Sequence, residues 1–179
     1  MRITVFCGSE KGQLKEYSVM AAEIGRYIGE SGHELIFGGS AAGLMGIVCD
    51  EAIKHGASVI GVEPDIEEIK KVKHSGIKKV YYTKTLSDRK EIMIDLADAF
   101  IVLPGGLGTL DELTEILELL KLGEINKPIV IVNTRKFYSQ FFDFINNIAS
   151  QGFLRKDFLG TYLLSDDLSE IKAYLKRQA

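Results

Sequence analysis

Six short apolar runs alternate with helix-length segments from one end of the chain to the other. The runs are rich in β-branched residues and show no regular polar alternation, which is typical of strands whose two faces are both covered. They span residues 3–6, 34–37, 58–62, 79–82, 99–103 and 128–133. Because strand and helix alternate in this order, the sequence predicts an α/β fold with a single doubly wound, mostly parallel sheet and helices on both faces.

The segments between these runs have the length and patterning of helices. They lie near residues 14–31, 43–55, 86–97, 109–122 and 137–150, and a last helix is expected near 167–178. The segment 64–78 is the least regular, with mixed charge and one glycine, and we expect a short helix followed by a loop there.

Two of the expected helices carry apolar stripes that we assign to the core. In helix 109–122 the stripe consists of Leu110, Leu113, Ile116, Leu117 and Leu120. In helix 137–150 the expected core face consists of Phe137, Phe141, Ile145 and Ile148, with Tyr138 and Phe142 beside it. The width of these apolar surfaces indicates broad packing on the sheet or an interface with another chain.

Length and composition limit the class of protein. A chain of 179 residues is long enough for one domain with its own core, and we treat residues 1–179 as that domain. The net charge of −3 gives no bulk attraction to nucleic acid or to an anionic membrane. Apolar stretches are strand-sized, and the first residues enter a strand pattern directly, so we expect neither a membrane span nor a signal peptide.

The cysteines and histidines do not form a recognisable metal or disulfide pattern. Cys7 and Cys49 are the only cysteines, which implies no disulfide framework and makes a reducing cytoplasm the simplest compartment. His33, His55 and His74 are scattered along the chain. We therefore expect no metal site and no cofactor.

Three of the strands end in glycine-rich turns that precede a helix. The turns are "VFCGSEKG" at 5–12, "FGGSAAGLMG" at 37–46 and "VLPGGLGT" at 102–109. In a parallel sheet they fall at the carboxyl edge, where open α/β sheets bind their ligands. Glycine exposes backbone amides to a close ligand, and the following helix adds unpaired N–H groups and a positive dipole end. Together the turns predict a site for a phosphorylated, nucleotide-like ligand.

The glycine spacing excludes two common nucleotide-binding classes. None of the turns matches GxxxxGK[ST], which disfavours Walker-type ATP hydrolysis. None has GxGxxG in a first βαβ unit, and no acidic residue ends the second strand, which disfavours a dinucleotide dehydrogenase. Any one turn alone would be explained as a tight connection between a strand and a helix.

The third turn carries residues that admit a structural and a chemical interpretation. Thr109 and Glu112 have the T-x-x-E spacing of a capping box, which contributes about 1 kcal/mol to helix stability. Glu112 in the first helical turn is also well placed to face a bound sugar. Glu115 lies on the same helix face and is either a second site carboxylate or a solvated charge.

Another helix start lies in "LSDRKEIM", residues 86–93, with Ser87 or Asp88 as the expected N-cap. Arg89 and Lys90 then lie near the helix N-terminus, where a cation is electrostatically disfavoured. This placement is explained by an anion in the neighbouring cleft. A salt bridge from Lys90 to a nearby acidic side chain is an equal alternative.

The combined motifs resemble the LONELY GUY family of cytokinin riboside 5′-monophosphate phosphoribohydrolases, long labelled "lysine decarboxylase". "PGGLGTLDE" at 104–112 matches the PGGxGTxxE signature of that family. "VFCGSEKG", "FGGSAAGLMG" and "DRKEIM" resemble its first two glycine turns and its Arg-Lys motif, and the likeness extends over about residues 2 to 154. Ser40 stands where many members have a third glycine.

The resemblance implies roles for individual residues. Arg89 and Glu112 match the catalytic pair of the family. The positions that match its substrate-binding residues are Gly8, Ser9, Gly38, Gly39, Lys90, Gly105, Gly106, Gly108 and Thr109. The resemblance also implies a Rossmann-like fold, a nucleoside monophosphate substrate, and a homodimer with active sites near the subunit contact.

The reaction implied by the resemblance is hydrolysis of the N-glycosidic bond of an adenosine 5′-monophosphate, either plain or N6-prenylated, to free base and ribose 5-phosphate. A lysine decarboxylase would need pyridoxal phosphate and a Schiff-base lysine, and no lysine stands in such a context. The alternative is a non-catalytic carrier or sensor of a phosphorylated cofactor or nucleotide, similar to the molybdenum-cofactor carriers that share a PGGxGT turn. Such a carrier needs the phosphate turn but not the pair Arg89 and Glu112.

Overall fold

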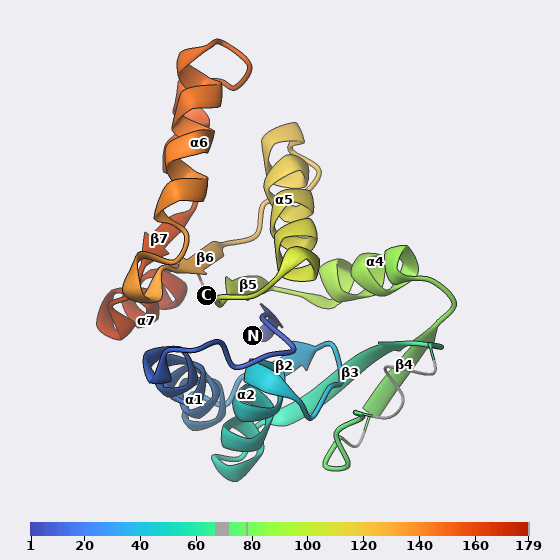
Figure 1. Ribbon diagram of the computed structural model, residues 1–179. Helices are drawn as coiled ribbons and strands as arrows, with labels where there is room; N and C mark the ends of the chain where they lie inside the picture. Colours follow the sequence, from blue (N-terminus) through green and yellow to red (C-terminus); the bar gives the residue numbers. More distant parts are fainter. Residues whose placement is uncertain (67–71, 78, 179) are drawn as a thin grey trace.

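The computed structural model describes residues 1–66, 72–77 and 79–178, and these form a seven-stranded sheet (Figure 1). The strand order is β4-β3-β2-β1-β5-β6-β7, and all neighbouring strands run parallel. In chain order the strands are β1 (Arg2–Phe6), β2 (Glu34–Phe37), β3 (Ser58–Pro64), β4 (Lys79–Thr83), β5 (Ala99–Val102), β6 (Ile129–Val132) and β7 (Leu163–Ser165). The sheet grows in both directions from β1, which confirms the predicted doubly wound fold.

Helices cover both faces of the sheet (Figure 1). One face packs against α1 (Lys15–Glu30), α2 (Gly43–Lys54) and α7 (Leu168–Arg177). The other face packs against α4 (Leu86–Leu96), α5 (Leu107–Leu122) and α6 (Ser139–Ser150). Short 3₁₀ turns, η1 (Thr134–Lys136) and η2 (Lys156–Gly160), precede α6 and β7. Because both faces are covered, strands such as β5 and β6 are buried at every position, as their continuous apolar runs predict.

The six predicted strands agree with the structure to within two residues at each end. The seventh, β7, was not predicted, because three residues are too few to show a periodic pattern. It joins the sheet through pairing with β6, where Leu163 stands opposite Val130. In segment 64–78, residues 67–71 and 78 lie outside the described part of the chain. Residues 72–74 lie along 39–41, with His74 N donating to Gly39 O at 2.8 Å.

The predicted core stripe of α5 is largely confirmed, whereas the predicted core face of helix 137–150 is confirmed only in part, because Phe141 and Ile145 pack against the core while Phe137 is exposed. In α5, Leu113, Ile116 and Leu117 are buried and Leu110 and Leu120 are half-buried. Around α6 the buried residues are Tyr138, Phe142 and Ala149, while Phe137 is exposed and Phe141, Ile145 and Ile148 are half-buried.

The position of Tyr138 explains this difference. Its hydroxyl donates to the buried carbonyl of Leu103 at 2.8 Å, which turns the Tyr138–Phe142 side of the helix toward the sheet. Apolar residues lie on both sides of α6, so periodicity alone did not distinguish the two faces. Figure 1 shows α5 and α6 extending in the same direction beyond the sheet, where little of the sheet remains to cover them. Within the described residues, no helix is both long and apolar enough to cross a bilayer.

Candidate active site

The three glycine turns meet at the carboxyl edge of the sheet, as predicted. Gly8, which follows β1, donates its backbone N–H to the carbonyl of Pro104 after β5 at 3.1 Å. The N–H of Leu44 at the start of α2 donates to the carbonyl of Gly8 at 3.0 Å. Gly8 therefore ties the first turn to both of the others.

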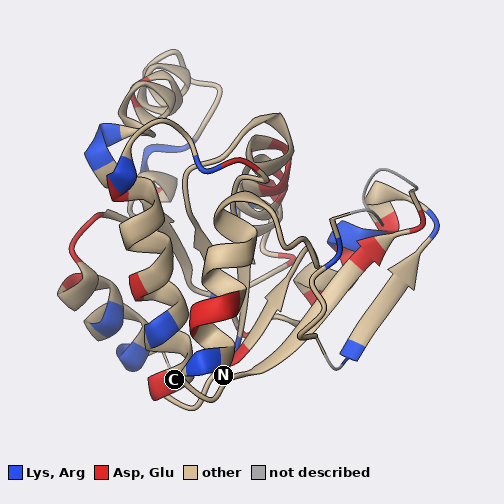
Figure 2. Cartoon of the chain, turned by 60° about the horizontal axis from the view of Figure 1, so that its bottom comes forward, with Lys and Arg blue, Asp and Glu red and all other residues tan. Residues whose placement is uncertain are grey.

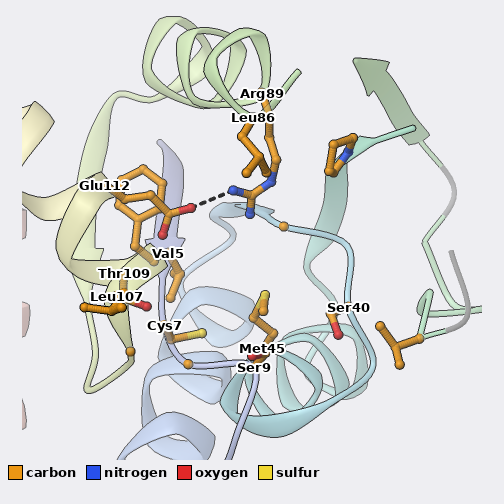
Figure 3. A pocket seen from close by; sticks show the side chains of 17 residues that line it. Val5, Cys7, Ser9, Ser40, Met45, Leu86, Arg89, Leu107, Thr109 and Glu112 are labelled. Atoms are coloured by element: carbon orange, nitrogen blue, oxygen red, sulfur yellow. Dashed lines mark hydrogen bonds and ion pairs between the residues drawn. The ribbon is translucent and has the colours of Figure 1, made fainter. Parts of the chain in front are cut away.

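A cavity of about 330 Å³ opens between these turns, and we call it the main cavity (Figure 3). Its size falls in the range of small-molecule sites. The described residues that line it are Val5, Phe6, Cys7, Gly8, Ser9, Gly38, Ser40, Met45, Pro64, Val72, Leu86, Arg89, Gly106, Leu107, Gly108, Thr109 and Glu112.

The N-terminus of α5 supplies free backbone donors at this cavity. The N-cap of the helix is Gly106, which has no side chain to accept a hydrogen bond, and the first intrahelical bond runs from Leu110 N to Gly106 O at 3.0 Å. The amides of Leu107, Gly108 and Thr109 therefore precede the helical ladder. Together with the helix dipole they form a site suited to a phosphate or another anion.

The glycines of this turn have different surroundings. A Cβ on Gly105 would lie 2.2 Å from Thr109 Oγ1 and 2.8 Å from Gly8 N, so the close contact between the turns requires glycine there. A Cβ on Gly106 or Gly108 would meet no atom within 4 Å. Packing does not explain these two glycines, and both leave their backbone open toward the main cavity.

Arg89 and Glu112 form a buried ion pair inside the main cavity. Arg89 Nη1 donates to Glu112 Oε1 at 2.7 Å, and the two side chains are only 13% and 8% exposed. Figure 3 shows Arg89 reaching from α4 and Glu112 from α5 toward each other. The structure thus brings together the two residues that the resemblance assigns to catalysis.

Arg89 is held from three sides. Its Nε donates to the carbonyl of Val62 in β3 at 3.1 Å, and its Nη1 is bound to Glu112. The guanidinium also lies against Gly38, where a Cβ would come within 2.2 Å of Nη2. Gly38 therefore admits the arginine into the cavity, and the guanidinium is fixed in place before any ligand binds.

The protonation of Glu112 is set by opposing effects. Burial raises the pKa of its carboxyl, while the charge of Arg89 and the hydrogen bond from it lower that pKa in part. Burial also raises the pKa of the Cys7 thiol, and the neighbouring Glu112 charge adds to this. Cys7 is therefore a neutral wall of the cavity and not a thiolate nucleophile.

Lys90 points away from the main cavity and does not line it. Its Nζ lies 2.8 Å from Asp111 Oδ2 and 2.7 Å from Glu115 Oε2. The salt-bridge alternative stated for Lys90 is thus confirmed, and Glu115 serves as its partner.

Two other predicted binding residues also lie outside the lining of the main cavity. Gly39 has φ +82° and packs against the side chain of Glu63. Gly105 lies behind the turn, where it lines a smaller cavity of about 190 Å³ with Tyr17 and Phe137. Gly8, Ser9, Gly38, Gly106, Gly108 and Thr109 all line the main cavity.

Sequence reasoning missed several apolar residues of this wall. Met45, Leu86 and Leu107 line the cavity, and Leu107 is 86% exposed. Cys7, Met45 and Leu107 could have been found, because each is adjacent to a glycine of a predicted turn. Nothing in the spacing of Leu86 distinguishes it from an ordinary helix residue.

Two predicted helix caps are wrong. α5 begins at Leu107 with Gly106 as its N-cap, so Thr109 and Glu112 do not form a capping box. The extra turn leaves Glu112 free to bind Arg89. α4 is capped by Thr85 and not by Ser87 or Asp88, because Asp88 N donates to Thr85 Oγ1 at 3.0 Å.

Comparison with known proteins finds a matching family model and several similar proteins. A family model described as "possible lysine decarboxylase" matches residues 45–175. A cytokinin riboside 5′-monophosphate phosphoribohydrolase of Rhodococcoides fascians is 37% identical over 85% of this chain and 77% of its own length. The protein of the same name, LOG, from Oryza sativa subsp. japonica is 40% identical over 87% of this chain, which spans 64% of the rice protein.

Solved structures share the fold at lower identity. The molybdenum cofactor carrier protein of Chlamydomonas reinhardtii superposes with a TM-score of 0.74 at 23% identity, covering 99% of this chain and 96% of the carrier. The molybdenum cofactor binding protein of Rippkaea orientalis gives 0.75 at 20% identity over 98% and 95% of the two chains. By sequence, the chain belongs to the family described as possible lysine decarboxylase, the LONELY GUY family.

Proposed function

We propose that this protein hydrolyses the N-glycosidic bond of a nucleoside 5′-monophosphate, releasing the base and ribose 5-phosphate. The observation that carries the proposal is the buried Arg89–Glu112 pair beside the free amides of the α5 N-terminus. The relatives named cytokinin riboside 5′-monophosphate phosphoribohydrolases support an adenosine monophosphate, plain or N6-prenylated, as substrate.

The transition state of this reaction has oxocarbenium character, so positive charge develops on the ribose. The carboxylate of Glu112 stabilises that charge, because it lies in a cavity from which much of the water is excluded. Its Oε1 is held by Arg89, which leaves Oε2 to contact a ribose hydroxyl or to orient the attacking water. Arg89 also favours the ionised form of Glu112 against the effect of burial.

The amides of Leu107, Gly108 and Thr109 bind the 5′-phosphate and so fix the sugar relative to Glu112. Ser9 and Gly8 of the first turn line the same cavity and complete the phosphate-binding wall. Arg89 Nη2, which lies against Gly38, is placed either to contact the phosphate or to assist the departure of the base.

The older label of lysine decarboxylase does not fit this site. A Schiff-base mechanism needs a lysine that reaches the cofactor carbonyl. None of the described residues that line the main cavity is a lysine. Lys90, the nearest lysine in sequence to the catalytic pair, is bound to Asp111 and Glu115.

A carrier or sensor of a phosphorylated compound is the second candidate, favoured by the fold shared with molybdenum cofactor carriers. Their identity to this chain is below 25%, so the likeness concerns the fold. A carrier has no use for a buried acidic group beside a phosphate site. The Arg89–Glu112 pair therefore favours the hydrolase.

The test is incubation of purified protein with AMP and with isopentenyladenosine monophosphate, followed by chromatographic detection of free base. We expect base release from at least one of them. Glu112→Gln and Arg89→Ala should each lower kcat by about 10²-fold or more, as expected for the loss of one electrostatic contact. The circular dichroism spectrum of both variants should stay that of the wild type. Binding of both nucleotides without base release would favour the carrier, and normal turnover by either variant would remove that residue from the mechanism.

We also propose that the protein is a homodimer of the cytoplasm. Exposed apolar side chains on and after α6, Phe144 at 60% and Phe153 at 86%, support an interface there. The free thiols of Cys7 and Cys49 are consistent with a reducing compartment. Light scattering coupled to gel filtration measures the mass of the assembly, and a mass of about 20 kDa, equal to one chain, would contradict the dimer.

A further inference from the structure

Two layers of ion pairs join α4 to α5, and they involve adjacent residues on both helices. In the inner layer Arg89 binds Glu112 inside the main cavity at 2.7 Å. In the outer layer the next residue of α4, Lys90, binds Asp111 at 2.8 Å and Glu115 at 2.7 Å. Each catalytic residue therefore has a neighbour in the chain that takes part in the outer layer.

The outer layer is not an ordinary surface salt bridge. The Lys90 side chain is only 14% exposed, whereas Asp111 and Glu115 are 62% and 37% exposed. A lysine with most of its stem buried and two carboxylates on its ammonium group has little freedom to reach a ligand. It also does not line the main cavity.

We propose that Lys90 is a positioning residue for the hydrolase reaction: its ammonium group fastens the start of α5 to α4 and compensates the charge of Asp111 next to Glu112. This role rests on the proposed function, and it replaces the substrate contact that the family resemblance implies for Lys90. The substrate meets Arg89 and Glu112, and Lys90 acts only through them.

The charges around Glu112 explain why such compensation matters. On α4, Arg89 and Lys90 lower the pKa of Glu112, and on α5 the carboxylate of Asp111 raises it. Among the described residues, Cys7, which follows β1, and Tyr138, which precedes α6, also interact with Glu112, and burial keeps both neutral. The charged groups that act on Glu112 are therefore Arg89 and Lys90 on α4 and Asp111 on α5. When Lys90 is lost, Asp111 is uncompensated and Glu112 binds its proton more tightly.

The experiment compares Lys90→Met, Asp111→Asn and the double variant. Methionine keeps the length of the buried stem and removes the charge. We expect the acidic limb of kcat/KM against pH to move up by about half a unit or more in Lys90→Met, because ionised Glu112 is the active form. In Asp111→Asn it should move down, and in the double variant it should lie between the two. The wild type and the three variants are measured with one substrate, so the titration of the substrate phosphate cancels in the differences between them.

A second readout does not depend on activity. Glutamate labelled with ¹³C at the carboxyl carbon gives one resonance per residue, and Glu112→Gln identifies that of Glu112. We expect its titration midpoint to shift in the same directions as the acidic limb. Because this measurement needs no turnover, it separates a failure of the proposed function from a failure of the role given to Lys90.

Lys121→Met is the matched control, since Lys121 pairs with Glu118 on the same helix and is more exposed. It should shift neither the limb nor the resonance. An increase of KM in Lys90→Met with an unmoved limb and an unmoved resonance would overturn the proposal, because it would mean that Lys90 binds the substrate directly. An equal loss of activity at every pH, also without a shift, would reduce Lys90 to a residue that only supports folding.

Discussion

At the residue scale, the site depends on glycines that serve different purposes within one short turn. Gly105 allows the third turn to touch Gly8, and Gly38 allows Arg89 to enter the cavity. Gly106 and Gly108 face open space. The same residue type thus permits close packing at two positions and leaves the backbone open at two others, and only the surroundings of each Cα distinguish them.

Alanine at Gly105 and at Gly108 should have opposite effects. In Gly105→Ala the new methyl would clash with Thr109 and Gly8, and we expect a loss of about 1–3 kcal/mol in the free energy of unfolding. In Gly108→Ala the methyl meets no protein atom in the first turn of α5, so stability should be unchanged or higher by up to about 1 kcal/mol. Nucleotide binding by Gly108→Ala should nevertheless weaken by roughly tenfold or more, because the methyl lies where the phosphate approaches.

Urea denaturation measures the free energy of unfolding of both variants, and calorimetric titration with AMP measures the nucleotide affinity of Gly108→Ala. Wild-type affinity in a folded Gly108→Ala protein would mean that the phosphate does not approach this amide.

At the element scale, the placement of Arg89 and Glu112 depends on where two helices begin. α5 starts at Leu107 with Gly106 as its N-cap, whereas its T-x-x-E pattern predicts a start after Thr109. α4 starts after its N-cap Thr85. With these starts, Arg89 and Glu112 both lie inside their helices, past the N-caps, and their side chains meet in the main cavity. If α5 began one turn later, after Thr109, Glu112 would be part of the capping box at the helix start.

The cap of α4 can be tested directly. Thr85→Ala removes the acceptor for Asp88 N, and we expect a loss of about 1 kcal/mol of stability. Thr85→Ser keeps the hydroxyl and should restore most of it. Ser87→Ala, at one of the two exposed positions that the sequence offered as the cap, should stay within about 0.5 kcal/mol of the wild type. Chemical denaturation of the three variants measures these differences, and a larger loss in Ser87→Ala than in Thr85→Ala would contradict the assigned cap.

At the scale of the whole molecule, the site lies where the strand order reverses, beside β1 and β5. The crossovers after these two strands go to opposite faces of the sheet, so a crevice remains open between their turns. Figure 2 shows that Lys, Arg, Asp and Glu positions are distributed along the chain over several helices and connections. Among the described residues, buried charge outside the cavity is represented by Glu63, which is 2% exposed at the end of β3.

Glu63 should make the stability of the whole fold depend on pH. Burial raises its pKa above the ordinary 4.5, and Lys73, 3.8 Å away, offsets this only in part. A group whose pKa is raised on folding stabilises the fold while it is protonated, and that contribution is lost as pH rises through the folded pKa. We therefore expect Glu63→Gln to be more stable than the wild type at pH 8 and not at pH 4. Thermal denaturation at both pH values tests this, and an advantage at pH 4 alone would reverse the assigned sign.

The sequence by itself determined the parallel sheet and the three glycine turns at one edge, and it singled out Arg89 and Glu112, the pair to which we assign catalysis. Continuous apolar runs, glycine spacing and the PGGxGTxxE motif are local features, and local features are what a sequence displays. Only the tertiary structure decided which face of α6 is buried, where α4 and α5 begin, and that Lys90 turns outward to Asp111 and Glu115. These depend on contacts between residues far apart in the chain, such as Tyr138 with Leu103 and Arg89 with Glu112, which the local patterns of caps and stripes do not display.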